Sequence, residues 1–364
     1  MGRPEDAALA IALAERLRAN NLTRMVDAVL ALAQPAIRLD LTRVDDAAEL
    51  PLGASKVGGA PDLPPDAAWP ATSAGQLLPF IAQLRLADVA PFDLEGDLPH
   101  TGLLSFFYAM NDADGEYRIE DDSTAWRAIW TPDDDASLIR LDTPQALREA
   151  LDSYFPACSV AFSRRLTLPG TESYAIQQLG FTNDERIGYI NITTGSDVGY
   201  LAEMDLRLLG YPYELEPGTF TDAFRVAHGE PSPVYEQTGE QQEQRRAMER
   251  MQQAATRWVA PPEGYANNFQ RARALWGLWH DIDKDDRKLI LSMSRPQPTP
   301  PEVLQAMAER QRAIEGEWRL LFQVYSNEEA EMDWAGGGVI HFGVTRDALA
   351  VRDFSKVWVN LQSL

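Results

Sequence analysis

Three short segments decide the fold: KVGGAP at Lys56–Pro61, LPFIAQL at Leu78–Leu84 and GLLSFFY at Gly102–Tyr108. The first segment has two adjacent glycines followed by a proline. Glycine adopts a positive φ at little cost and proline fixes its own φ, so this segment predicts a tight turn. The other two segments are short apolar runs rich in aromatic residues, which is typical of buried strands. Together they predict a β unit that opens on a glycine turn.

Similar segments return in the same order later in the chain. They are LLGYP at Leu208–Pro212, LLFQV at Leu320–Val324 and GVIHFGV at Gly338–Val344. Two copies of one β unit are the simplest interpretation. Gln83 and Gln323 occupy equivalent positions, which indicates a shared structural task, such as hydrogen bonding to backbone groups near the junction of the copies. We therefore expect two related, mainly antiparallel β subdomains that arose by internal duplication.

A helical arm is predicted at residues 1–35, before the β body. Pro4–Ala19 is rich in alanine and places leucines one turn apart, which indicates a helix with one apolar stripe. A second helix is expected to begin at a cap on Asn21 and to end at Pro35. We expect this arm to pack on the sheet. The alternative is a dimerisation element.

A helical insertion is predicted in the second copy, at about 220–316. Within it, Glu240–Trp258 and Phe269–His280 have helix-forming composition, and a third helix is expected from about 299 to 314. The duplicated β body then spans residues 36–364 around this insertion. Helices added to an antiparallel β body make the expected fold class α+β.

The same segments resemble the YwqG-like family, a bacterial domain of unknown function. Its members carry a Lys-x-Gly-Gly-x-Pro turn, a Trp-Pro pair, a Pro-Phe-x-x-Gln strand and a Gly-Leu-Leu-x-Phe-Phe strand. All four are present, with the pair at Trp69–Pro70, and the similarity continues to Asp353–Trp358. One departure stands at Tyr325–Asn327, where the family pattern has an acidic Asp-Ser-Asp. The resemblance implies two related β subdomains from about residue 50 onward and no established activity.

The net charge limits the kinds of binding partner that we expect. The chain has 55 acidic and 33 basic residues, a formal net charge of −22 and a pI near 4.6. Binding to a phosphate backbone needs clustered lysine and arginine, so we expect no nucleic acid partner. An acidic surface instead favours a basic protein partner and speeds its encounter, although acidity also serves solubility alone.

The cysteine content and the hydropathy of the first thirty residues indicate the cellular compartment that we expect. Cys158 is the single cysteine, which excludes an internal disulfide framework, and its apolar neighbours predict a buried strand thiol. The first thirty residues alternate charged residues with Ala and Leu, so neither a signal peptide nor a membrane span is expected. We therefore expect a cytoplasmic protein without a membrane partner. No oligomeric state is predicted.

Candidate binding residues come from the turn, the strands and one loop. His341 lies on a predicted strand that points it either into a cleft between the two sheets or onto a partly exposed outer face. Trp334 stands before three consecutive glycines and is expected to be an exposed recognition residue. The full set of candidate binding residues is Lys56, Trp69, Gln83, Gln323, Trp334 and His341.

No catalytic residue, metal site or cofactor is predicted. The four histidines include no pair at the i, i+2 or i, i+4 spacing that presents two nitrogens to one metal. A Gly-x-Ser-x-Gly nucleophile turn is absent. The acidic run Asp281–Asp286 has the spacing of a calcium loop at its start. It lacks the glycine and the bidentate glutamate that such a loop needs, so we interpret it as a solvated linker.

Two functional hypotheses follow from these features. The favoured one is a non-catalytic cytoplasmic binding protein, in its most concrete form an inhibitor or immunity partner of a basic protein. The alternative is a hydrolase or small-ligand enzyme in which acids, His341, Gln83 and Gln323 meet in a groove between the two subdomains. A deep pocket with His341 beside a carboxylate favours the enzyme. A shallow acidic face favours the binding protein.

Overall fold

The computed structural model describes most of the chain outside the predicted insertion. The described residues are 4–45, 49–109, 124–132, 137–150, 153–198, 204–215, 218–230 and 301–363. The chain divides into two compact units, Met1–Gly229 with Ala308–Leu364 and Glu230–Met307, and the sheet belongs to the first. The expected helices at 240–258 and 269–280 and the acidic run at 281–286 lie outside the described residues.

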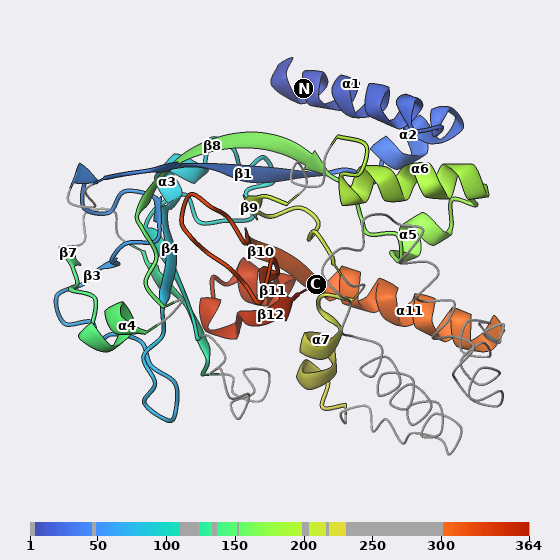
Figure 1. The fold of residues 1–364 in the computed structure, drawn as a ribbon. Coiled ribbons are helices and arrows are strands. Elements are labelled where there is room, and N and C mark those ends of the chain that lie inside the picture. Colours follow the sequence, from blue (N-terminus) through green and yellow to red (C-terminus); the bar gives the residue numbers. More distant parts are fainter. Residues whose placement is uncertain are drawn as a thin grey trace, which may run out of the picture. The chain divides into compact units, whose positions relative to one another are not determined.

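One large antiparallel sheet forms the body of the first unit (Figure 1). Among the described residues its ten strands have the order β12-β11-β10-β9-β1-β8-β2-β4-β5-β6. The strands are β1 Gln34–Arg43, β2 Lys56–Val57, β4 Phe80–Arg85, β5 Leu103–Tyr108, β6 Trp126–Thr131, β8 Cys158–Thr167, β9 Leu206–Leu208, β10 Trp318–Tyr325, β11 Val339–Thr345 and β12 Trp358–Gln362. The edge strands approach each other, since Trp126 Nε1 donates to Val357 O at 2.7 Å. The sheet is therefore nearly closed.

The long strands β1 and β8 pair over their full length at the centre of the sheet. Outward from β8 the order is β2, β4, β5 and β6, which we name the first half; outward from β1 it is β9, β10, β11 and β12, the second half. The strands that carry the repeated segments thus occupy matching positions. Their pairing also shifts register at matching places, between Phe80 and Ala82 in β4 and between Leu320 and Phe322 in β10.

The N-terminal arm packs against other helices at one end of the sheet. Helices α1 (Pro4–Ala19) and α2 (Val26–Leu30) share a small apolar core with α5 (Tyr174–Gln177), α6 (Asn183–Thr194) and the end of β8. Figure 1 shows this group where β1 begins and β8 ends. Arg16 of α1 binds Asp197, just after α6, with a distance of 2.7 Å from Nε to Oδ2.

Two details of the arm differ from the prediction. Asn21 does not cap a helix: its φ is +64°, and a 3-10 turn at Thr23–Met25 comes before α2. Pro35 does not end a helix either, because α2 ends at Leu30 and Pro35 lies within β1. Proline is tolerated there because β9 pairs with β1 only over Ile37–Leu39, so the missing N–H interrupts no bond to β9.

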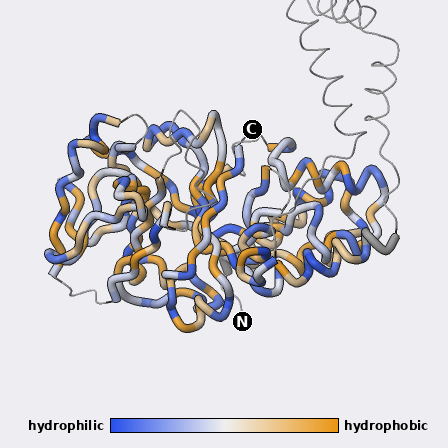
Figure 2. The backbone as a smooth tube through the Cα atoms, turned by 90° about the horizontal axis from the view of Figure 1, so that it is seen from below, coloured by the Kyte–Doolittle hydropathy of each residue, from blue (hydrophilic) through white to orange (hydrophobic). Residues whose placement is uncertain are grey.

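Apolar side chains fill the space on both sides of the inner strands. Every residue of β5 is buried, and β4, β10 and β11 each leave a single residue partly or fully exposed. This explains why the repeated segments read as continuous apolar runs rather than as alternating ones. Figure 2 shows apolar stretches interrupted by polar ones throughout the described tube. Of the helices described, none is long and apolar enough to cross a membrane.

Short elements connect the strands. The third helix expected for the insertion is present as α11. The remaining elements are α3 Leu86–Val89, α4 Gln145–Glu149, α7 Thr221–Ala227, α11 Pro301–Glu317, α12 Arg346–Ala350, the 3-10 turn Phe354–Lys356 and the two-stranded sheet of β3 Asp62–Leu63 with β7 Ile139–Arg140.

Candidate functional site

A buried cluster of charges lies in the first half. Lys56 Nζ is 3.0 Å from Asp62 Oδ2, and Arg140 Nε donates to Asp62 Oδ1 at 2.8 Å. Gln83 lies opposite Lys56 in the β2–β4 pair. Its amide donates to Asp62 Oδ2 at 2.8 Å and to Ala54 O at 2.9 Å, and its oxygen accepts from Asp62 N at 2.8 Å. One carboxylate and one glutamine thus join β2, β4 and the β3–β7 pair.

The charges of this cluster compensate one another. Burial lowers the pKa of Lys56 to about 8, and the attraction of Asp62 limits that change. Burial alone would raise the pKa of Asp62, but the hydrogen bond from Arg140 and the charge of Lys56 hold it below its usual value. A carboxylate that stays ionised between two cations is a structural ion cluster, costly to break once it is buried.

The second half repeats the glutamine and changes its partners. Gln323 lies opposite Arg207 of β9 and His341 of β11. Its oxygen accepts from Tyr213 N at 2.7 Å and Arg207 Nη2 at 3.3 Å, and its amide donates to Asp205 O at 3.0 Å. His341 Nε2 lies 2.8 Å from Tyr213 O. A carbonyl only accepts, so Nε2 carries the proton and donates it.

His341 is wholly buried, which corrects both orientations expected from the sequence. Burial, assisted by the charge of Arg207, lowers the pKa of His341 to about 3, so the ring is neutral at physiological pH. Its Nδ1 is buried and has no hydrogen-bond partner among the described residues. The loop at Tyr213 covers the face of β11 that carries His341, so this histidine lies neither in an open cleft nor on an outer surface.

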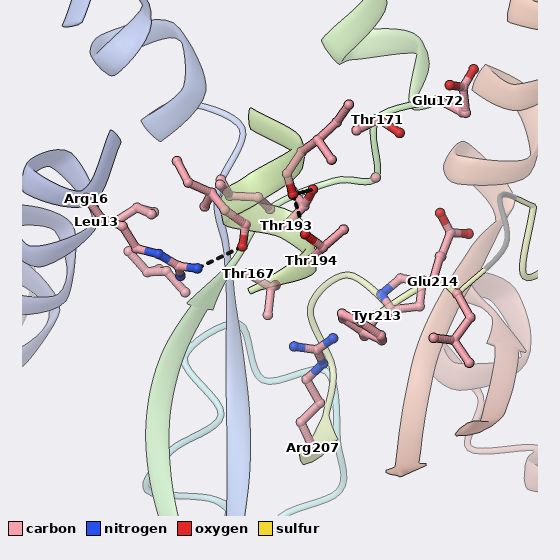
Figure 3. Close-up of a pocket in the computed structure, with 17 residues that line it drawn as sticks. Leu13, Arg16, Thr167, Thr171, Glu172, Thr193, Thr194, Arg207, Tyr213 and Glu214 are labelled. Carbon is pink, nitrogen blue, oxygen red and sulfur yellow. Dashed lines mark hydrogen bonds between the residues drawn. The ribbon is translucent and has the colours of Figure 1, made fainter. Parts of the chain in front are cut away.

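A cavity of about 250 Å³ lies between the arm, α6 and the second half (Figure 3). Aliphatic side chains from α1, α6, the end of β8 and the residue after it form its apolar wall: Leu13, Leu166, Leu168, Ile190 and Ile192. The other lining residues are the polar Arg16, Thr167, Thr171, Glu172, Thr193, Thr194, Arg207, Tyr213 and Glu214, together with Gly170, Pro212 and Leu215. An apolar wall with a few converging polar groups is the usual composition of a small-molecule site.

Arg207 supplies a buried cation to this cavity. Its side chain is 3% exposed, and Nη1 lies 3.4 Å from Oδ1 of Asp205, which also pairs with Arg165. Figure 3 shows the guanidinium extending from β9 toward the cavity beside Tyr213. Arg16 lines the opposite side, where its Nε and Nη2 each bind Asp197 at 2.7 Å.

Glu214 supplies a carboxylate to the same cavity. Its Oε1 accepts three hydrogen bonds, from Gly218 N at 3.2 Å, Thr219 N at 3.0 Å and Thr219 Oγ1 at 2.8 Å. Burial nevertheless raises the pKa of Glu214. A smaller cavity of about 60 Å³ shares Gly170, Pro212 and Glu214 with the first, so Glu214 stands between the two.

The two tryptophans among the predicted binding residues serve packing. Trp69 is half-buried, donates to Leu78 O at 2.9 Å and meets Phe107 edge-on. The expectation that Trp334 is exposed is wrong, since its side chain is 0% exposed and packs against Tyr108 and Phe155. Folding the loop inward buries a large aromatic area, and of the three glycines that follow only Gly336 is exposed.

The residues that form the cavity were not predicted from the sequence. Arg207 stands two residues before Leu209-Gly210, as Lys56 stands two before Gly58-Gly59, so extending the repeat alignment would have identified it. Glu214 carries no such signal, because the equivalent position of the first half is Leu63. The cavity also depends on α6, which was not predicted and which begins with a capping box between Thr182 and Glu185.

The Cys158 thiol is not activated, and metal-ligating groups do not gather in the described part of the chain. Cys158 is buried at the start of β8, as predicted, and burial raises the pKa of its thiol to about 11. At that pKa the thiolate is scarce at neutral pH. Within the described residues no three of the His, Cys, Asp and Glu side chains lie together as a metal site would require.

The fold and the site define a protein built on one nearly closed antiparallel sheet with a lined cavity at one end. Residues 55–363 match a family described as Domain of unknown function (DUF1963), and the chain belongs to this family. This match bears out the assignment to an uncharacterised family. No curated protein matches the chain.

Proposed function

We propose that the protein is a non-catalytic binding protein that holds a small ligand in the 250 Å³ cavity. The lining of that cavity carries the proposal, because a nearly fully buried guanidinium, a carboxylate and threonine hydroxyls converge on one apolar-walled space. The volume lies below the roughly 300–1,000 Å³ of sites for drug-sized molecules. The ligand is therefore a small metabolite with both polar and apolar parts.

The buried groups support binding over catalysis. The enzyme alternative needs His341 beside a carboxylate in a pocket. His341 instead bonds to a backbone carbonyl, its pKa is lowered to about 3, and it does not line the cavity. A general base needs a pKa near the working pH and access to a substrate proton. Gln83 and Gln323 are committed to backbone groups, consistent with structural roles.

We also infer that the two halves of the sheet arose from one duplicated β unit. Gln83 and Gln323 each accept from the backbone N–H six residues beyond the cation opposite them, which is Asp62 after Lys56 and Tyr213 after Arg207. Each also donates to a carbonyl two residues before that cation. Matching strand positions and register shifts support the same inference.

A pair of tryptophan variants tests the binding proposal. Thr194 lines the cavity at the end of α6, so Thr194→Trp fills it, whereas Ser196 is exposed two residues further on and is absent from the lining. Thermal unfolding is measured with panels of amino acids, carboxylates, amines, sugars and nucleosides. A ligand at 100 times its Kd stabilises the folded state by about 2.7 kcal/mol.

We expect one class of compound in the panel to raise the Tm of the wild type and of Ser196→Trp. The same class should leave the Tm of Thr194→Trp unchanged. Thr194→Trp must itself unfold cooperatively for this comparison. Stabilisation that persists in Thr194→Trp would place the ligand elsewhere. If no class stabilises the wild type, the cavity is not a small-molecule site.

A basic protein remains our proposed macromolecular partner, and the cytoplasmic location stays a prediction. The support is the formal net charge of −22, since a field of that sign speeds the encounter with a basic surface. An inhibitor or immunity role requires stoichiometric capture of a basic protein from the native host. Binding of this kind should weaken as salt is raised, because exposed charges are screened. Capture that does not depend on salt would contradict it.

A further inference from the structure

We propose that the ligand of the cavity is a free amino acid with an aliphatic side chain, its carboxylate on Arg207 and its ammonium on Glu214. This inference rests on the proposed function, because it names the ligand class of the same cavity. Three parts of the lining carry it: a fixed guanidinium, an oriented carboxylate and an aliphatic wall.

Arg207 suits a carboxylate of the ligand. Its guanidinium is planar and always ionised, and it binds carboxylates through two parallel hydrogen bonds. Contacts with Gln323 Oε1 at 3.3 Å and Asp205 Oδ1 at 3.4 Å fix its orientation from the strand side. The side chain thus enters the cavity in a fixed position, so a ligand carboxylate meets a donor group that needs little reordering.

Glu214 suits an ammonium group of the ligand. All three of its hydrogen bonds reach Oε1, and no donor among the described residues reaches Oε2. Oε2 lies against Gly170, where a Cβ would come within 2.5 Å of it, so the absence of a side chain at 170 leaves room for this oxygen. Burial raises the pKa of Glu214, and a nearby cation would restore its ionised form.

The apolar wall suits an aliphatic side chain. One part of the cavity is formed by α1, α6 and residues 166–168, and its aliphatic residues are Leu13, Leu166, Leu168, Ile190 and Ile192. Arg207 and Glu214 line the part formed by β9 and the loop after it, with Pro212, Tyr213 and Leu215. A molecule that carries both charges at one end and a branched hydrocarbon at the other matches this division. A sugar would leave the aliphatic wall without a partner, and a fatty acid would leave Glu214 without one.

Three matched probes test the assignment by isothermal calorimetry. L-leucine carries both charges, 4-methylpentanoate lacks the ammonium and 3-methylbutylamine lacks the carboxylate. Losing one partner of a buried hydrogen-bonded charge pair weakens binding by at least about 30-fold. We therefore expect L-leucine to bind at least about 30-fold more tightly than either analogue.

The variant Glu214→Gln separates recognition from a structural role. Glutamine keeps an oxygen for the donors of Gly218 and Thr219 and removes the charge. This variant should lower the affinity for L-leucine by at least about 30-fold and leave the affinity for 4-methylpentanoate unchanged. Glu328→Gln is the control, because Glu328 is an exposed carboxylate that does not line the cavity. It should change the affinity for L-leucine by less than about threefold, as expected for an exposed charge.

The outcomes distinguish this inference from the proposed function. Equal affinity for L-leucine and 4-methylpentanoate, or a Glu214→Gln variant that weakens both alike, would overturn the amino acid assignment. A sugar or nucleoside that raises the Tm of the wild type and leaves that of Thr194→Trp unchanged would also overturn the amino acid assignment. The binding proposal would stand in that case. If the wild type binds none of these probes and no class of the wider panel, both proposals fail.

Discussion

The two halves of the sheet use the same glutamine for the same backbone bonds, yet they surround it with different chemistry. Gln83 and Gln323 each accept one backbone N–H and donate to one backbone carbonyl at distances of 2.7–3.0 Å. The turns match as well. Gly58 and Gly59 have φ of +70° and +73°, and Leu209 and Gly210 have +60° and +72°. The backbone task is therefore shared between the halves.

The side chains beside the glutamine differ. Asp62 of the first half brings a carboxylate that neutralises Lys56 and Arg140, whereas the equivalent Tyr213 contributes through its backbone. Ser105 stands across from Gln83, and His341 stands across from Gln323. The first half closes its charges within the core, and the second half directs Arg207 toward a cavity. Where a glutamine holds the backbone in this way, the neighbouring positions can carry different side chains.

The largest loss in the free energy of unfolding is expected from a substitution at position 62. The difference between the two halves depends there on one carboxylate. Asp62→Asn keeps the shape and leaves Lys56 and Arg140 without their shared counterion. Breaking a buried pair by removing one partner costs about 3–5 kcal/mol, because an uncompensated charge stays buried. Urea unfolding at pH 7 measures the loss.

The matched control for this prediction is Asp222→Asn. It breaks an ion pair of 3.1 Å with Arg225 in which Asp222 is exposed. Exposed pairs contribute about 0–1 kcal/mol, so this variant should unfold close to the wild type. If Asp62→Asn were no more destabilising than Asp222→Asn, the charges of the first half would not be compensated through Asp62.

His341 in the second half should make the stability of the protein sensitive to acid. The first half has Ser105 at the matching position. The folded protein keeps His341 neutral down to about pH 3, because burial lowers its pKa, whereas an unfolded chain protonates histidine near 6.5. The unfolded state therefore binds more protons below pH 6.5, and stability falls as pH falls. His341→Gln removes this titration and keeps a donor for Tyr213 O.

Stability measured from pH 7 to pH 5 tests this prediction. The wild type should lose roughly 1.4 kcal/mol per pH unit below 6.5 relative to His341→Gln, or about 2 kcal/mol at pH 5. The comparison uses the change with pH, so any constant cost of the substitution cancels. Parallel pH profiles of the two proteins would show that His341 does not stay neutral on folding.

The fold follows largely from the repeated segments. Glycine turns and apolar strand runs predicted the inner strands, because these signals depend on local geometry. The near closure of the sheet was not predictable in this way. It depends on contacts between β6 and β12, such as Trp126 against Trp358, which are distant in sequence.

Less of the candidate site than of the fold could be predicted from the sequence. Lys56, Gln83, Gln323 and His341 stand out in the sequence as polar residues within apolar segments, and the structure shows that this pattern marks buried hydrogen bonding. The cavity draws its walls from α1, β8, α6, β9 and the loop at Glu214. Such a lining exists only after these elements pack together, and none of them carries a sequence motif that indicates a cavity.

The smallest effect is expected at position 213, the counterpart of position 62. Tyr213 donates its N–H to Gln323 and accepts from His341 at its carbonyl, and both bonds survive a change of side chain. Tyr213→Phe keeps the ring that meets Tyr325 edge-on at 6.5 Å between centroids. It removes only a hydroxyl, so the loss should be at most about 1 kcal/mol, the net worth of one hydrogen bond. Urea unfolding beside Asp62→Asn measures the contrast between the halves. A loss as large as that of Asp62→Asn would mean that the Tyr213 side chain, rather than its backbone, holds the second half together.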